Sequence, residues 1–178
     1  MKKITIGKIW LFGIGRFGWS LLSGLIATWL VYFYQPDLAA QKAGQIIYIP
    51  QGRVVLGIIT IIGAITAIGR LFDAFTDPWI ASKSDRCKSK SGRRIPFLRM
   101  SALPLALATF GIFFAPVQRT SWVNAIWLLI FILCYYLAIT AYCTPYTALI
   151  PELGKTQKDR MTISTVISLT FIVGTALA

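Results

Sequence analysis

Residues 69–86 read GRLFDAFTDPWIASKSDR and join the end of an apolar segment to a basic loop. The apolar segment, residues 54–79, is long enough for a helix that crosses a bilayer, which takes roughly 20 residues. Its second half nevertheless carries Arg70, Asp73 and Asp77. Ionisable residues inside a membrane span usually face the interior of a helix bundle and mark a functional site. The stretch therefore predicts a helical membrane protein with a charged interior.

The rest of the chain continues this alternation of apolar runs and short polar loops. Of its 178 residues, 56% are hydrophobic and 13% are charged, against about 25% charged in soluble domains. A soluble chain of this length lacks the interior to bury so much apolar surface, and a disordered chain would carry much less of it. We therefore expect an all-α, polytopic membrane protein with five transmembrane helices, over residues 9–34, 54–79, 96–115, 122–149 and 161–178.

The basic residues predict how the chain lies in the membrane. Twelve of the 18 Lys and Arg residues lie in the N-terminal segment, in the loop over residues 82–95 and in the loop before residue 161, whereas the intervening loops hold Lys42, Arg53 and Arg119. Cytoplasmic loops are enriched in Lys and Arg, so we expect a cytoplasmic N-terminus and a bacterial inner (plasma) membrane. The net charge of +12 then needs no nucleic-acid partner.

Two acids in the second span suggest a cation site. Asp73 and Asp77 are four residues apart, so on a helix both carboxylates lie on one face. Two carboxylates this close resist joint ionisation unless a cation neutralises them. Na⁺ suits carboxylate and hydroxyl oxygens, and a bound proton would serve the same purpose. Thr140 could supply a further oxygen if residues 122–149 pack on residues 54–79.

The same residues also allow structural interpretations. Arg70 precedes Asp73 by three positions and could form an internal ion pair with it, leaving Asp77 near the cytoplasmic interface. One arginine, however, does not fully offset two acids. The hydroxyl of Thr140 could bond to the backbone of its own helix instead of a cation.

Two glycine patterns suggest enzymes. Residues 13–18 contain G-x-G-x-x-G, which binds a dinucleotide only between a strand and a helix, and here it lies in an apolar segment. Gly69, Asp73 and Asp77 form G-x-x-x-D-x-x-x-D, which resembles the end of the metal-binding signature of membrane alcohol phosphatidyltransferases. That signature also needs an upstream acidic half, and the only acid before Asp73 is Asp37. We expect no enzyme and no cofactor, with the phosphatidyltransferase as the enzyme alternative.

The loop after the second span carries a pattern of its own. An acid and a basic residue are followed by a glycine and two further basic residues: Asp85, Arg86, Gly92, Arg93 and Arg94. This pattern resembles the conserved loop between helices two and three of the major facilitator superfamily. Asp85 could pair with an arginine or lie at a helix N-terminus, and either contact would latch one conformation. A solvated basic loop is the alternative, and the two interpretations are compatible.

Three segments resemble one branch of that superfamily, the glycoside–pentoside–hexuronide:cation symporters. They are FDAFTDP (residues 72–78), PYTALIP (residues 145–151) and YFY (residues 32–34). The resemblance covers most of the chain, from about residue 12 to residue 160. It implies that Asp73, Asp77 and Thr140 correspond to the family's cation-binding residues.

The resemblance also implies a solute site unlike the family's galactoside site. The positions of its sugar-binding carboxylates fall on Ser20 and Cys143, and that of a sugar-stacking tryptophan falls on Thr147. The inward faces of residues 9–34 and 122–149 would then hold the solute. The substrate-binding candidates are Trp19, Ser20, Tyr142 and Cys143.

Taken together, the resemblance implies the N-terminal part of a twelve-helix secondary transporter, in which two six-helix bundles rock around a midplane site. A coupling cation, Na⁺ or H⁺, would be carried with a sugar-like or other small organic solute. The expected partners are the lipid bilayer, the solute and the missing C-terminal half of the same transporter. The alternative is an inactive fragment or a membrane subunit that depends on a partner chain, which would not need two acids on one helix face.

Overall fold

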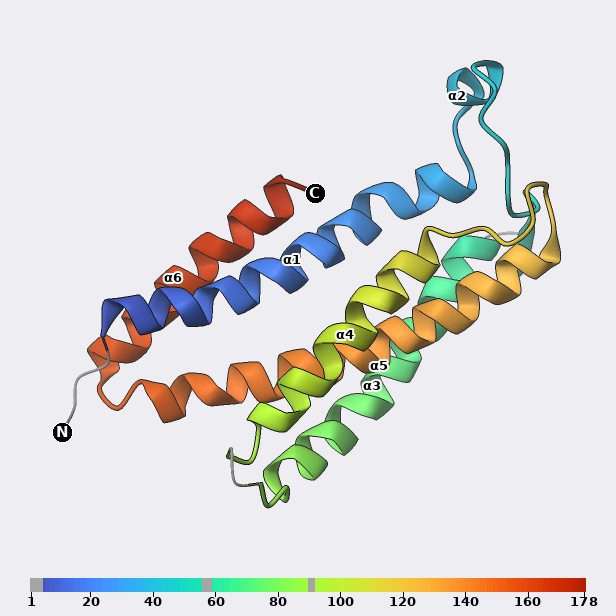
Figure 1. Ribbon diagram of the computed structural model, residues 1–178. Helices are drawn as coiled ribbons and strands as arrows, with labels where there is room; N and C mark the ends of the chain where they lie inside the picture. The colour runs from blue at the N-terminus through green and yellow to red at the C-terminus, as the bar shows by residue number, and fades with distance from the viewer. Residues whose placement is uncertain (1–4, 56–58, 90–91) are drawn as a thin grey trace.

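A computed structural model describes residues 5–55, 59–89 and 92–178. Within them the chain forms six helices and one pair of short strands (Figure 1). The elements are α1 (Ile6–Tyr34), α2 (Leu38–Lys42), β1 (Arg53–Val55), β2 (Ile59–Thr60), α3 (Ile61–Asp85), α4 (Ile95–Ile112), α5 (Trp122–Leu153) and α6 (Gln157–Ala176). Lys2, Lys3 and Lys90 of the basic loops lie outside the described residues, as do residues 56–58 of the second expected span.

The long helices form two groups (Figure 1). One is the pair α1 and α6, which lie side by side, and the other is α5 with its two neighbours α3 and α4. The end of α5 also meets α6, so the two groups are joined where the chain passes from one to the other. This arrangement lets side chains from α1, α3, α5 and α6 line one internal space.

The surface of the bundle is that of a membrane protein. Within the described residues, α1, α4 and α5 are each long and apolar enough to cross a membrane. Apart from Arg99, the exposed side chains along α4 are apolar and include Met100, Leu103, Leu107 and Phe110, as suits contact with lipid tails. The expected fold class, an all-α polytopic membrane protein, is confirmed. The more polar helices α3 and α6 remain predicted spans.

Helix α3 begins later than the expected start near residue 54. Residues 53–55 instead pair with residues 59–60 as an antiparallel two-stranded ladder. Thr60 then caps the helix, because its Oγ1 accepts a hydrogen bond from Gly63 N at 3.1 Å. This bond satisfies one of the N–H groups that lack a partner at a helix start. Apolar character alone did not distinguish the ladder from the helix that follows it.

Other helix ends also differ from the expected spans. Pro78 lies inside α3, and Pro145 and Pro151 lie inside α5. None of them ends its helix, so both helices run past their expected ends. Thr156 and Asp159 form a capping box that starts α6 earlier than expected, because each side chain accepts a hydrogen bond from the backbone N–H of the other residue.

Glycines allow the close contact between α1 and α6. Gly13 of α1 faces Val166 of α6, and Gly174 of α6 faces Ser20 of α1. A side chain at either glycine would push the two helices apart, since small residues are what lets membrane helices approach closely. The glycine pattern of residues 13–18 lies wholly within α1, so the strand-to-helix setting of a dinucleotide site is not present there.

Asn124, near the start of α5, holds together the loops at the end of the bundle that carries α2. Its side chain is fully buried. The amide nitrogen lies 3.0, 2.9 and 3.0 Å from the carbonyl oxygens of Tyr48, Val117 and Arg119, and Oδ1 accepts a hydrogen bond from Val117 N at 3.1 Å. Thr120 adds a 2.6 Å bond from its hydroxyl to Ile47 O. The two loops are thus joined by hydrogen bonds between uncharged groups.

Candidate functional site

Helices α1, α3, α5 and α6 line an internal cavity of about 1120 Å³. This is slightly larger than the roughly 300–1,000 Å³ of typical small-molecule sites. The charged side chains of its lining are Arg16 from α1 and Arg70, Asp73 and Asp77 from α3. The cavity therefore gathers charged side chains between apolar helices, with Arg70 and Asp77 exposed and Arg16 and Asp73 half-buried.

The structure brings two of the three expected cation ligands into direct contact. The hydroxyl of Thr140 on α5 donates a hydrogen bond to Asp73 Oδ1 on α3. Thr140 is buried, so its hydroxyl is directed to a carboxylate and not to water. Asp77 lies one helical turn after Asp73 and lines the same cavity. Two carboxylates and one hydroxyl from two helices are thus available on one side of the cavity.

Arg70 does not neutralise these acids directly. It forms no ion pair with Asp73 or Asp77, in contrast to the arginines of the loop after α3. Its guanidinium instead lies over the ring of Tyr136 on α5, with Cζ 5.2 Å from the ring centroid. The alternative of an internal ion pair between Arg70 and Asp73 is therefore not what the structure shows.

The four expected solute-binding residues divide into two pairs. Trp19 and Cys143 line the cavity. Ser20 and Tyr142 are not among its lining residues. Ser20 is fully buried at the α1–α6 interface and donates to Phe17 O at 2.9 Å, and the Tyr142 hydroxyl donates to Gly15 O at 3.2 Å. Both hydroxyls thus bond to the backbone of α1.

Arg16 is a cavity residue to which the sequence assigned no role. Its Cζ lies 4.0 Å from the ring centroid of Trp19 and 4.9 Å from that of Phe171 on α6. A lone arginine in an apolar segment was the available signal for it. The contribution of Phe171 could not be seen in the sequence, because it depends on α6 packing beside α1.

At the other end of the bundle from Asn124, Arg94 joins α3, α4 and α5. Its Nη2 donates to Asp85 Oδ1 at 2.9 Å, and its Nη1 lies 3.0 Å from Glu152 Oε1. Nη1 also donates to Ala148 O. Arg93 lies farther from Glu152, at 3.5 Å. The expected pairing of Asp85 with an arginine is therefore present, and its role as a latch stays a prediction.

The remaining residues of the loop pattern shape its backbone. Arg86 is the C-cap of α3, and its backbone N–H donates to Ser82 O at 3.3 Å. Gly92 has a φ of 102°, a conformation that glycine adopts at little cost. Glu152 was not among the sequence candidates, because it lies nearly 60 positions after Arg93 and meets it only through packing.

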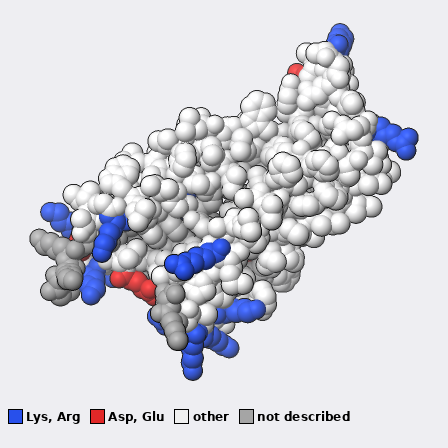
Figure 2. Space-filling view, viewed as in Figure 1, with Lys and Arg blue, Asp and Glu red and all other residues white. Residues whose placement is uncertain are grey.

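The Lys and Arg side chains gather at the end of the molecule where α3 and α5 end and α4 and α6 begin (Figure 2). The opposite end, which carries α2, shows few of them (Figure 2). The charge asymmetry read from the loops is thus an asymmetry between the two ends of the folded bundle.

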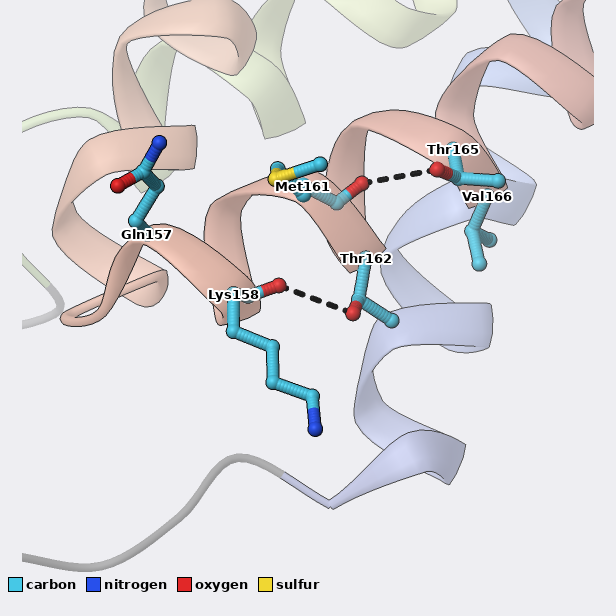
Figure 3. A pocket seen from close by; sticks show the side chains of 6 residues that line it. All are labelled: Gln157, Lys158, Met161, Thr162, Thr165 and Val166. Atoms are coloured by element: carbon cyan, nitrogen blue, oxygen red, sulfur yellow. Dashed lines mark hydrogen bonds between the residues drawn. The ribbon is translucent and has the colours of Figure 1, made fainter.

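A second pocket along α6 is a weaker candidate site. It is lined by Gln157, Lys158, Met161, Thr162, Thr165 and Val166. Figure 3 shows that the hydroxyls of Thr162 and Thr165 donate to the carbonyls of Lys158 and Met161, at 3.0 and 2.9 Å. These hydroxyls are therefore occupied by the helix itself, and the cavity between α1 and α3 is the stronger candidate.

The fold and cavity define a class of protein: a polytopic helical membrane protein with ionisable side chains around an internal cavity, as in proteins that move solutes across membranes. Residues 11–178 match the family described as MFS/sugar transport protein. The chain belongs to this family of the major facilitator superfamily, and the resemblance based on residues 72–78 and 145–151 is confirmed.

Individual relatives carry the names of transporters. The chain is 28% identical over 154 residues to an uncharacterised symporter of Synechocystis, with 84% of this chain and 25% of that protein covered. It is 22% identical over 155 residues to the isoprimeverose transporter of Lactiplantibacillus pentosus, covering 87% and 29%. It is 31% identical over 115 residues to the sodium-dependent lysophosphatidylcholine symporter 1-B of Danio rerio, covering 62% and 22%.

These relatives place the chain outside the enzyme classes considered above. They are named as transporters or symporters and not as enzymes. The chain spans between a quarter and a third of the length of these bacterial relatives.

Proposed function

We propose that this chain forms the N-terminal part of a cation-coupled symporter for a small organic solute. The observation that carries the proposal is the hydrogen bond from Thr140 on α5 to Asp73 on α3, with Asp77 lining the same cavity. It joins the residues that the family resemblance implies for a cation site. The missing C-terminal half would supply the second bundle around the cavity, as in other transporters of this architecture.

The coupling ion is Na⁺ or H⁺. Carboxylate and hydroxyl oxygens are hard ligands that suit Na⁺, and either carboxylate could bind a proton instead. The name of the sodium-dependent zebrafish relative supports Na⁺. The ion shifts the conformational equilibrium only through its different affinity for the two states. The membrane potential adds about 2.3 kcal/mol per charge per 100 mV.

The solute is sugar-like or another small organic molecule, bound in the cavity near Trp19 and Cys143. The position of both residues in the cavity lining supports this assignment. The name of the isoprimeverose transporter supports a sugar, and that of the lysophosphatidylcholine symporter supports a lipid. Ser20 and Tyr142 would act indirectly, through the contacts of α1 with α6 and α5.

The proposed orientation has the N-terminus and the Arg94 network on the cytoplasmic side of a bacterial inner membrane. The basic end of the molecule supports it (Figure 2), because cytoplasmic loops are rich in Lys and Arg. The bacterial sources of two of the relatives support the choice of membrane. Release of Arg94 from Asp85 would then open the cytoplasmic end as the bundle rocks.

The test is cation binding by the full-length protein that contains this chain, followed as the midpoint of thermal unfolding. We expect Na⁺, or acid pH if H⁺ is the coupling ion, to raise the midpoint, and K⁺ and choline to leave it unchanged. Asp73→Asn and Asp77→Asn should each weaken the response at least about tenfold in apparent affinity, since each removes a charge that stabilises the cation. Thr140→Val should weaken it less.

The matched control is Asp37→Asn. Asp37 caps the short helix α2 through Ala40 N and lies outside the cavity, so its cation response should equal that of the unmodified protein. If both Asp73→Asn and Asp77→Asn kept the full response, the cation site would be refuted and a partner-dependent subunit would be the better interpretation.

A further inference from the structure

Helix α1 contributes an arginine to the cavity lining that has no acidic partner among the described residues. Arg16 lies over the rings of Trp19 and Phe171, at 4.0 and 4.9 Å from their centroids. These rings orient the guanidinium from two helices, α1 and α6. No hydrogen bond or ion pair joins the side chain of Arg16 to another residue within the part of the chain that the structure describes.

Two buried N–H donors meet at this point without acceptors. Arg16 Nε and Trp19 Nε1 are both inaccessible to solvent, and neither has a hydrogen-bond partner among the described residues. Most buried polar groups in native proteins are hydrogen-bonded, so an unmet pair of donors calls for an explanation. Both residues line the cavity, and a ligand there with an oxyanion would supply the missing acceptor.

The charges of the cavity balance before any ligand binds. Its charged lining residues are two arginines, Arg16 and Arg70, and two aspartates, Asp73 and Asp77, which sum to zero. A monovalent cation bound by the aspartates would leave one uncompensated positive charge around the cavity, and this charge would attract an anion. A solute with one negative charge restores neutrality, whereas a neutral solute does not.

We infer that the cavity binds a solute carrying a single carboxylate, with that group held by Arg16 and the Trp19 indole N–H. The inference rests on the proposed cation site, because the cation creates the charge that the carboxylate balances. Each of the two ligands then binds more tightly in the presence of the other, since binding linkage is reciprocal. A phosphate monoester, at about −1.5 to −2 near neutral pH, would exceed the charge available.

Arg70 is the less suitable partner for the solute. It lies on α3, the helix that carries both carboxylates, three positions before Asp73. Its guanidinium already lies over the Tyr136 ring. A solute anion placed there would approach the two aspartates and be repelled by them, whereas Arg16 lines the cavity from another helix, α1.

The experiment compares molecules that differ in charge and share a ring. D-Glucuronate, D-glucose and D-glucose 6-phosphate are titrated into the purified full-length protein, in sodium buffer at pH 6, which supplies either coupling ion. Benzoate and benzyl alcohol form a second matched pair without a sugar. We expect at least one of the two monocarboxylates to raise the midpoint of thermal unfolding, and its neutral partner and the phosphate to bind at least about tenfold more weakly.

Variants then test which residues hold the carboxylate. Arg16→Gln should weaken binding of the carboxylate at least about tenfold, and Arg16→Lys by less, because lysine keeps the charge but not the planar fork of donors. Trp19→Phe keeps an aromatic ring beside Arg16 but removes the indole N–H together with its five-membered ring, so it should lower the affinity for the carboxylate more than the affinity for the neutral partner. Arg99→Gln, on the exposed surface of α4, removes one positive charge outside the cavity and should leave the affinity for the carboxylate unchanged.

The outcomes separate this inference from the proposed function. A cation response without solute that is lost in Asp73→Asn supports the cation site, whatever the solutes do. Suppose that this cation response is present. The inference is then overturned, and the proposed function stands, in either of two cases: the neutral molecules bind as tightly as the acids, or neither acid binds. If the acids bind through Arg16 but no cation response exists, the cation site fails and the carboxylate site remains.

Discussion

The two ends of the bundle are closed by different chemistry. Asn124 is fully buried and joins two loops through hydrogen bonds between uncharged groups. Arg94 joins three helices through charged partners, Asp85 and Glu152, whose side chains are 57% and 44% exposed. Water can replace the partners of the second network far more readily than those of the first. From this comparison we predict a fixed end at Asn124 and a releasable end at Arg94.

The largest effect on this comparison should come from Asn124→Ala. The substitution leaves several buried backbone groups without partners, and we expect a loss of about 2–4 kcal/mol in the free energy of unfolding. Denaturant unfolding of the full-length protein in detergent measures it. Gln118→Ala is the control, because Gln118 lies in the same region but is exposed. A loss below about 1 kcal/mol for Asn124→Ala would contradict the fixed end.

Arg94→Gln should have the next largest effect, about 1–2 kcal/mol, because Arg94 makes charge-assisted hydrogen bonds while its acidic partners are half exposed. The loss should be local. Hydrogen exchange should therefore quicken at the end of α3 and the start of α4, and stay unchanged near Asn124. Equal changes at both ends would argue against a separate latch.

Salt should distinguish the two networks. At about 1 M salt the Debye length falls to roughly 3 Å, so the difference in unfolding free energy between the unmodified protein and Arg94→Gln should shrink. The difference for Asn124→Ala should stay the same, because no charge is removed. A salt response of the same size in both variants would remove the distinction drawn here.

Arg93→Gln should have the smallest effect. Arg93 is 61% exposed and lies 3.5 Å from Glu152, and exposed pairs of this kind contribute at most about 1 kcal/mol. We expect a change in unfolding free energy below about 0.5 kcal/mol, measured beside Arg94→Gln under the same conditions. An effect as large as that of Arg94→Gln would mean that the two arginines act as one unit.

The membrane helices could be predicted from sequence because their signal is local. An apolar run of sufficient length is visible without knowing what packs against it. The late start of α3 was missed, since the ladder of residues 53–55 and 59–60 is as apolar as the helix it precedes. Thr60 caps α3 through a contact within the local chain, but the prediction used only the length of the apolar run.

The candidate site was predicted only in part. Asp73 and Thr140 were paired through the family resemblance, and the structure joins them by a hydrogen bond. Ser20 and Tyr142 were expected to line the cavity but are not among its lining residues. A small rotation of a helix decides which of its side chains face the cavity, and the sequence does not show that rotation. The sequence shows Arg16 only as a charge in an apolar segment, and its role could not be assigned before Phe171 was placed beside it.

By itself the sequence determined that this protein crosses a membrane, that one end is basic and that charged residues lie within its spans. These properties follow from composition and order along the chain. The tertiary structure decided which of the charges are paired. Arg94 pairs with Asp85 and Glu152, Asp73 accepts a hydrogen bond from Thr140, and Arg16 lies over aromatic rings without an acidic partner among the described residues. Pairing depends on contacts between helices far apart in sequence, which only packing brings together.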